Sequence, residues 1–321
     1  MSISANAVLL EPGRLQRQNN VNKKGNAMKK DKKVGAILQT ELNTAKFKVI
    51  YALIFVSLII MAAAAVLPTV WIMLSGFKDV KEIYSVPPTF LPKTIKLSKL
   101  WDVWKRLELG RNYLNSLYIL IGEVVFAIIV NALGGYVISK IKPKGSKFIF
   151  LIVVWTMLMP SAGRTIPIYM EIVKMPVINI SLLDTYWPMW LMAGANSFSL
   201  LLFKNFFDSV SRSLVEAARI DGATELGIFF KIMLPLSVPV LAYVGMMAAQ
   251  NSWGAFFWPN IVLNNQNLVP MATKLYKMKT GLFSMDEQFL ALIFSVVPMA
   301  VIFICFQKYI MGGINIGGVK G

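Results

Sequence analysis

Long apolar stretches, each close to the length that crosses a lipid bilayer, restrict the fold of this chain more than any other feature. A helix needs about 20 mainly apolar residues to cross the hydrocarbon core. Within that core only helices and closed barrels satisfy every backbone hydrogen bond, and stretches of this length suit helices. We therefore expect an all-α, polytopic membrane protein with six transmembrane helices, near Val49–Leu74, Tyr113–Ile138, Phe148–Met170, Thr185–Phe203, Leu236–Phe257 and Phe289–Phe306.

Two of these stretches are less regular than the rest. Pro160 and Arg164 interrupt the third stretch. The uncharged region Ile232–Thr273 is long enough for two spans, but its second half carries several amide side chains that do not suit contact with lipid. We expect one span there, followed by an outer loop over Pro259–Glu287.

The distribution of charge also indicates a membrane protein. Only 15% of the residues are charged, against about 25% in a soluble domain. The net charge is +17, but the basic residues gather at the ends of apolar stretches, as in Lys140, Lys142, Lys144 and Lys147. Basic residues in short loops favour the cytoplasmic side, so we expect both termini in the cytoplasm and no binding of nucleic acid. The basic loop Phe77–Asn112 fits this orientation less well.

The residue inventory gives little support to an enzyme. The chain has no histidine and a single cysteine, Cys305, which excludes histidine-based acid–base catalysis, histidine metal sites and an internal disulfide. It also lacks the glycine-rich phosphate loop of ATPases. We therefore predict no catalytic residue and no metal site, and we expect any ATP hydrolysis to occur on another chain.

The connection 209–235, between the fourth and fifth stretches, has a local pattern of its own. Ser213 and Glu216 match a capping box, so a helix should begin directly after Ser213. Gly222 can adopt the left-handed conformation that ends a helix. Thr224 can cap a second helix, which Pro235 should halt or kink where the fifth stretch begins. The sequence thus predicts two short helices joined by a tight glycine turn.

This predicted unit should expose Glu216, Arg219 and Asp221. An exposed unit attached directly to a membrane helix can pass the rigid-body motion of a partner into the membrane. The alternative is an amphipathic loop that merely joins two helices. Local properties alone favour neither interpretation.

The spacing within the connection resembles a known signature. Glu-Ala-Ala at 216–218, a glycine after three further residues and Ile-x-Leu-Pro after nine more resemble in full the EAA signature of binding-protein-dependent ABC permeases. The resemblance extends over about residues 109–305 and implies the transmembrane domain of a type I ABC importer. The implied ATPase-coupling residues are Glu216, Ala217, Ala218, Asp221, Gly222, Ile232, Leu234 and Pro235.

Four other segments resemble carbohydrate permeases of the maltose type, in the MalG-like membrane subunit. They are Asn115-Ser116-Leu117, Gly135-Tyr136, the loop Phe77–Pro92 and the glycine-rich C-terminus Gly312–Gly321. A glycine-rich end alone would be typical of a disordered tail. Together with the loop signature, it implies a tail that contacts the ATPase through Gly317, Gly318, Val319, Lys320 and Gly321.

The resemblance also implies several partner chains. They are a second permease subunit in a heterodimer, two ATPase subunits that bind ATP and Mg²⁺, and an extracytoplasmic solute-binding protein. Glu216 would face a basic residue of the ATPase, and Gly222 would form the turn between the coupling helices. The implied location is the bacterial cytoplasmic membrane, in contact with lipid, and no cofactor is expected in this chain.

We expect four regions along the sequence. They are a basic cytoplasmic tail (1–47), the first transmembrane helix with its outer loop (48–108), the ABC transmembrane domain that contains the coupling loop (109–305) and a glycine-rich cytoplasmic tail (306–321).

Four side chains are candidates for a substrate pathway. Glu123 is an ionisable group inside the second stretch, where it should face protein or water. Gln250 and Asn251 could bind sugar hydroxyls, and Trp253 could stack on a sugar ring. Each of them could instead serve helix packing, Glu123 through an interhelical hydrogen bond.

The function that these patterns indicate is the permease subunit of a carbohydrate importer. One alternative is a permease of the same class for another small solute. An alternative from a different class is an ion-coupled secondary transporter, which should show inverted repeats and carboxylates for the coupling ion. Glu123 alone gives that alternative little support. A membrane-embedded enzyme is disfavoured by the lack of histidine.

Overall fold

The computed structural model describes residues 45–176, 178–281 and 283–311. Within these ranges every regular element is a helix, which confirms the all-α prediction. The chain divides into two units, residues 1–70 and 71–321, which are considered separately. Of the predicted tails 1–47 and 306–321, residues 1–44 and 312–321 lie outside the described residues. The remaining residues of both tails are helical, since α2 begins at Ala45 and α16 extends to Met311.

The first unit is represented by helix α2 (Ala45–Gly76), up to Val70. Every side chain from Lys48 to Val70 is exposed, although the segment is strongly apolar. A helix that is apolar on all sides is suited to lipid or to another membrane helix.

The second unit contains the remaining helices. Their bounds are α3 (Val80–Ile83), α4 (Ser98–Arg106), α5 (Leu109–Tyr136), the π-helical η2 (Val137–Ile141), α6 (Ser146–Leu158), α7 (Ser161–Val173), α8 (Trp187–Gly194), α9 (Ser197–Ser209), α10 (Arg212–Ile220), α11 (Glu225–Ile228), the π-helical η3 (Phe229–Met233), α12 (Leu234–Leu236), α13 (Val238–Gly254), α14 (Phe257–Val262), the 3-10 turn η4 (Gln266–Leu268), α15 (Met271–Thr280) and α16 (Met285–Met311).

Among the described residues, three helices are long and apolar enough to cross a membrane, and five candidates result if each of two bent pairs counts as one span. The three are Phe47–Gly76, Leu109–Ile141 and Met285–Gln307. The polytopic prediction is thus supported, but this criterion finds five spans at most where the sequence predicted six.

The fourth predicted span accounts for the difference, and the third is counted only as a bent pair. The third is broken at Pro160, where the axes of α6 and α7 diverge by 113°. The fourth is divided into α8 and α9, because the Asn196 side chain accepts a hydrogen bond from Ser199 N (2.8 Å) and caps a new helix. Neither α8 nor α9 alone has the length of a span.

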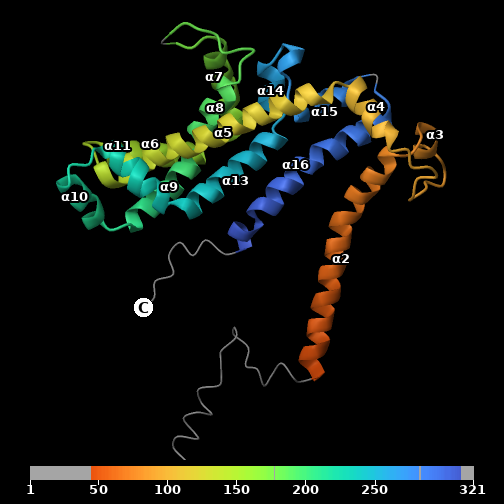
Figure 1. Cartoon of the computed structure of the whole chain (residues 1–321), viewed down its shortest axis with the longest axis horizontal. Coiled ribbons are helices and arrows are strands. Elements are labelled where there is room, and N and C mark those ends of the chain that lie inside the picture. Colours follow the sequence, from red (N-terminus) through yellow and green to blue (C-terminus); the bar gives the residue numbers. More distant parts are fainter. Residues whose placement is uncertain (1–44, 177, 282, 312–321) are drawn as a thin grey trace, which may run out of the picture. The chain divides into compact units, whose positions relative to one another are not determined.

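Helix α5 is the centre of the second unit. It packs against α8, α9 and α13, and α13 in turn packs against α16 (Figure 1). Small residues permit the closest approach: a Cβ added to Gly135 would lie 2.9 Å from Phe203 Cβ and from Lys204 N. The α5 and α9 backbones are therefore in contact at Gly135, as is usual where membrane helices pack tightly.

The residues after α13 are more ordered than the predicted outer loop. They fold into α14, η4 and α15, and α5 holds them through amides. Asn112 Nδ2 donates to Val269 O (2.7 Å), Asn115 Nδ2 donates to Asn267 O (2.7 Å), and Ser116 Oγ accepts from Met271 N (2.8 Å). These bonds explain how so many polar groups are accommodated beside an apolar bundle.

The basic loop contains a short helix, α4, which is fixed to α16. Lys99 forms an ion pair with Asp286 (2.8 Å), and Arg106 forms one with Glu287. Beneath them, side chains from α4, α15 and α16 form an apolar cluster that includes Val103.

Candidate functional site

The connection 209–235 folds into the predicted helix–turn–helix, which we call the knob (residues 211–236, α10 to α12). Helix α10 begins at Arg212, two residues earlier than predicted, because Ser211 is the N-cap and accepts from Ser213 N (3.3 Å). The expectation that Ser213 caps the helix was therefore wrong. The Ser213 hydroxyl instead hydrogen bonds to the Ser211 hydroxyl (2.7 Å).

Gly222 forms the turn as predicted. Its φ angle is +78°, in the left-handed region that favours glycine. Gly222 N donates to Arg219 O and Ala223 N donates to Ala218 O, both at 3.0 Å. This pair of bonds is the Schellman arrangement that satisfies the last carbonyls of a helix. A Cβ at position 222 would meet nothing within 4 Å, so the backbone conformation alone favours glycine here.

The second half of the knob also follows the prediction. Thr224 Oγ1 accepts from Gly227 N (3.1 Å) and caps α11. The helix then passes through the π-helical segment η3 and continues past Pro235 to Leu236. The run Glu225–Leu236 meets α13 at 82°. Pro235 lies one residue before the end of this run, close to the bend. Its ring and its missing N–H weaken the helix there, which is consistent with the predicted kink.

The knob has a buried face and an exposed face. Val215, Ala218, Ile228 and Phe229 are buried in the same apolar core as Tyr136 of α5. Ile232 and Leu234 pack against that core. Glu216, Ala217 and Asp221 are exposed and take no part in it. The exposed face is thus supported by side chains that join it to the membrane helices.

A polar contact reinforces this attachment. Glu225 of α11 accepts from Tyr136 Oη at Oε2 (2.8 Å) and from Arg219 Nε at Oε1 (2.7 Å). The hydrogen bond to Glu225 raises the pKa of Arg219 above its ordinary value, so the guanidinium stays charged. Three helices, α5, α10 and α11, meet at this carboxylate.

The end of α9, which leads into the knob, is held in a similar way. Asp208 accepts from Ser139 Oγ (2.6 Å) and pairs with Lys204 (2.7 Å). Burial alone would raise the pKa of Asp208, but the hydrogen bonds from Lys204 and Ser139 outweigh it and hold that pKa below the usual value. Lys140 Nζ also donates to Val210 O (2.6 Å).

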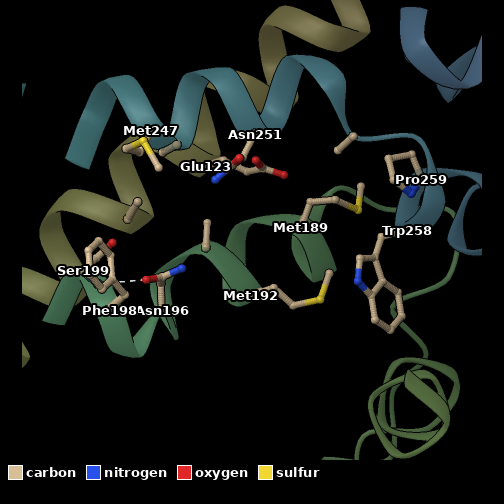
Figure 2. Close-up of a pocket in the computed structure, with 14 residues that line it drawn as sticks. Glu123, Met189, Met192, Asn196, Phe198, Ser199, Met247, Asn251, Trp258 and Pro259 are labelled. Atoms are coloured by element: carbon tan, nitrogen blue, oxygen red, sulfur yellow. Dashed lines mark hydrogen bonds between the residues drawn. The ribbon is translucent and has the colours of Figure 1, made fainter. Parts of the chain in front are cut away.

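A cavity of about 260 Å³ lies between α5, α8, α9 and α13 (Figure 2). Glu123 and Asn251 approach each other on one wall, and Met189, Met192 and Trp258 lie across the cavity from them. Glu123 is the one ionisable residue among those that line it. The lining therefore combines amide and carboxylate groups with sulfur and aromatic surfaces.

The cavity continues into a wider hollow of about 850 Å³ towards α6 and α7. The two share Met192, Asn196, Phe198 and Trp258. Arg164, which was noted in the sequence only as an interruption, lines the wider part.

The comparison with protein families decides the class of this chain. Residues 123–315 match the family described as binding-protein-dependent transport system inner membrane component. The chain belongs to this family. The Glu216–Pro235 signature is typical of it, and the permease is accordingly a membrane transport subunit rather than an enzyme.

Several characterised relatives resemble the permease along most of its length. The arabinooligosaccharides transport system permease protein AraQ of Halalkalibacterium halodurans is 31% identical over 81% of this chain and 93% of its own length. The polygalacturonan/rhamnogalacturonan transport system permease protein YtcP of Bacillus subtilis is 28% identical, over 84% and 97%. The melibiose/raffinose/stachyose import permease protein MelC of Bacillus subtilis is 27% identical, over 82% and 94%.

A solved structure shares the fold of the permease. It is a chain of a bacterial ABC transporter involved in the import of the acidic polysaccharide alginate, with a TM-score of 0.72 and 26% identity. The match covers 83% of the permease and 98% of that chain. The predicted type I importer fold is confirmed.

Of the predicted pathway residues, the structure brings only Glu123 and Asn251 of the permease into the cavity. Gln250 and Trp253 do not line it. Trp253 is buried, donates from Nε1 to Ser295 O (2.8 Å) and contacts the ring of Tyr113. This position suits helix packing rather than contact with a solute.

Other residues at both sites were not foreseen. Tyr136 and Glu225 lie 89 residues apart, so no local pattern could indicate their contact. Asn196, Met192 and Trp258 also line the cavity, and no pattern in the sequence singled them out. The predicted tail contacts Gly317–Gly321 lie outside the described residues.

Proposed function

We propose that this permease is one half of the translocation pathway of an ATP-driven, binding-protein-dependent carbohydrate importer, and that its knob docks on a separate ATPase. The observation that carries this proposal is the fold of the Glu216–Pro235 signature. Glu216, Ala217 and Asp221 form an exposed surface, and the opposite face is buried in the core shared with α5 and α13.

The knob is built to pass motion into the bundle. A rigid-body displacement of α10 would also move α11, because Arg219 and Glu225 join the two helices. The displacement would reach α5 through the hydrogen bond between Glu225 and Tyr136. Helices α5 and α13 also supply Glu123 and Asn251 to the cavity. Closure of an ATPase beneath the knob would therefore reach the wall of the cavity through packed side chains, without a flexible linker.

A carbohydrate is the substrate class that the relatives support, since AraQ, YtcP and MelC are named for oligosaccharide or polysaccharide transport. The amides Asn196 and Asn251 can bind hydroxyl groups, and Trp258 offers an aromatic face. A non-sugar solute is the second candidate within the class. Family membership argues against the ion-coupled secondary transporter.

The remaining partners follow from the same proposal. They are a second permease subunit, two ATPase subunits that bind ATP and Mg²⁺, and an extracytoplasmic solute-binding protein. The permease itself would carry no cofactor. Both termini would lie in the cytoplasm of a bacterium, with Gly317–Gly321 reaching the ATPase.

Reconstitution tests the proposal. The permease, its second subunit and the ATPase would be placed in proteoliposomes with the binding protein, and ATP-dependent uptake would be measured for arabino-, galacto- and gluco-oligosaccharides and for amino acids. Uptake of a sugar that requires ATP and the binding protein supports the proposal. Uptake driven by an ion gradient without ATP, or uptake of amino acids alone, contradicts it.

A further inference from the structure

A separate hollow of about 460 Å³ lies between η2, the start of α6 and the end of α9. Lys142, Lys147 and Lys204 line it, together with a single acidic residue, Asp208. The hollow is on the same side of the bundle as the knob, because Asp208 is two residues before Val210, where the chain turns into α10. It shares no lining residue with the cavity that contains Glu123.

The charges in this hollow do not balance. Lys204 is paired with Asp208 at 2.7 Å. Lys142 and Lys147 form no salt bridge with any of the residues that the structure describes, and both are exposed. Lys142 acts electrostatically on Asp208, but that carboxylate is already paired with Lys204. Three ammonium groups therefore line a hollow that holds one carboxylate, and this excess of positive charge favours an anionic ligand.

An apolar surface continues from the same place. Phe150 lines the hollow, and the Lys204 ammonium lies over its ring, 4.8 Å from the centroid. Along α6, Phe148, Ile149 and Ile152 are exposed and belong to none of the apolar clusters found among the described residues. A ligand that placed an anionic group at the lysines could therefore lay an apolar chain along α6.

We propose that this hollow binds the phosphate headgroup of an anionic phospholipid, such as phosphatidylglycerol or cardiolipin, with an acyl chain along α6. Basic hollows between membrane helices at the membrane surface are suited to such headgroups. An acidic protein surface could match the lysines, but it would not explain the adjacent exposed apolar row of α6. The bound lipid would brace the base of the knob, because Ser139 and Lys140 already bond η2 to the end of α9.

The test is lipid retention by the purified permease. The protein would be extracted in detergent, supplied with equal amounts of phosphatidylglycerol and phosphatidylcholine, and examined by native mass spectrometry. The variant Lys142→Asn with Lys147→Gln removes both free charges, and asparagine tolerates the left-handed conformation of Lys142 (φ 50°). Lys144→Gln is the matched control, since Lys144 is exposed in the same loop but does not line the hollow.

The wild type should retain phosphatidylglycerol in preference to phosphatidylcholine. Each lysine near an anionic headgroup contributes a factor of about five, so the double variant should retain about 25-fold less, and Lys144→Gln should behave as wild type. Thermal unfolding of all variants would confirm that they are folded.

Four results would overturn the proposal. The first is equal retention of the two lipids by the wild type, and the second is an equal loss of retention in Lys144→Gln. The third is displacement of the lipid by millimolar inorganic phosphate, which would indicate a soluble phosphate ligand. The fourth is unchanged lipid retention in a double variant that no longer co-purifies with the ATPase, which would indicate an acidic protein partner.

Discussion

The knob and the cavity both contact helices α5 and α13 but are built in different ways. The knob comes from one continuous segment, is fixed by buried side chains such as Phe229, and presents a small exposed face. The cavity is assembled from separate segments and is lined by side chains such as Asn251 and Met192 that have room around them. A docking surface must hold its shape under load, whereas a pathway must let a solute pass. The same helices thus serve a rigid function at one place and a permissive one at another.

We expect the largest effect from a substitution in the turn of the knob. Proline cannot adopt the φ of +78° found at Gly222 and also removes the N–H that bonds to Arg219 O. Gly222→Pro should therefore destabilise the coupling turn by about 3 kcal/mol or more. If transport requires this turn, ATP-dependent uptake should fall at least about a hundredfold. Asparagine tolerates the left-handed conformation, so Gly222→Asn should keep most of the uptake. Normal uptake by the proline variant would show that the turn does not couple anything.

Two neighbouring phenylalanines distinguish the contribution of the knob's buried face to stability from that of its exposed surface. Phe229 is fully buried, whereas Phe230 is 47% exposed. Removal of a buried phenylalanine costs about 3–5 kcal/mol of folding free energy, so Phe229→Ala should lower the thermal stability of the purified permease much more than Phe230→Ala. Equal shifts in the melting temperature of the two variants would contradict the anchored knob.

The exposed face is tested by charge. Glu216→Lys should reduce co-purification of the ATPase by about tenfold or more, since under the proposed docking the lysine would face a basic residue of the ATPase. Its thermal stability should not change, because Glu216 is exposed and makes no ion pair with a described residue. Glu171→Lys, an equal charge change at an exposed position on α7, is the control. Unchanged co-purification of the Glu216 variant would count against docking at this face.

The cavity should respond more weakly. Asn251 lines it and the adjacent amide Gln250 does not, so the two alanine variants form a matched pair. Asn251→Ala should raise the half-saturation concentration for uptake by about threefold to tenfold, because it removes one hydrogen bond to the solute. Gln250→Ala should leave that concentration unchanged. If both variants behave alike, the cavity is not the pathway.

The same contrast explains what the sequence could and could not predict. The knob was readable because its capping, turn and signature residues lie within one segment, and Gly222 and Thr224 act as local rules require. Ser213 was misassigned because two serines two residues apart compete for one cap. The contact between Tyr136 and Glu225 depends on how helices pack, which no local pattern encodes.

The cavity and the helix count were harder for a related reason. The break at Asn196 divides an apolar stretch that satisfies every compositional rule for a single span. Trp253 was taken for a pathway residue because its chemistry suits sugars, but its indole is used to join α13 to α16. Side-chain type alone could not predict which face of α13 lines the cavity.

The central claim, that the exposed face of the knob receives the ATPase, can be tested directly by cross-linking. Replacement of the single cysteine, Cys305, by serine gives a background for Glu216→Cys and for a control, Lys96→Cys, in the basic loop before α4. Each would be labelled with a maleimide photo-cross-linker in the assembled transporter and illuminated with and without ATP. We predict an ATPase adduct from position 216 alone, with a yield that changes when ATP binds. An adduct of equal yield from position 96, or none from position 216, would contradict the account.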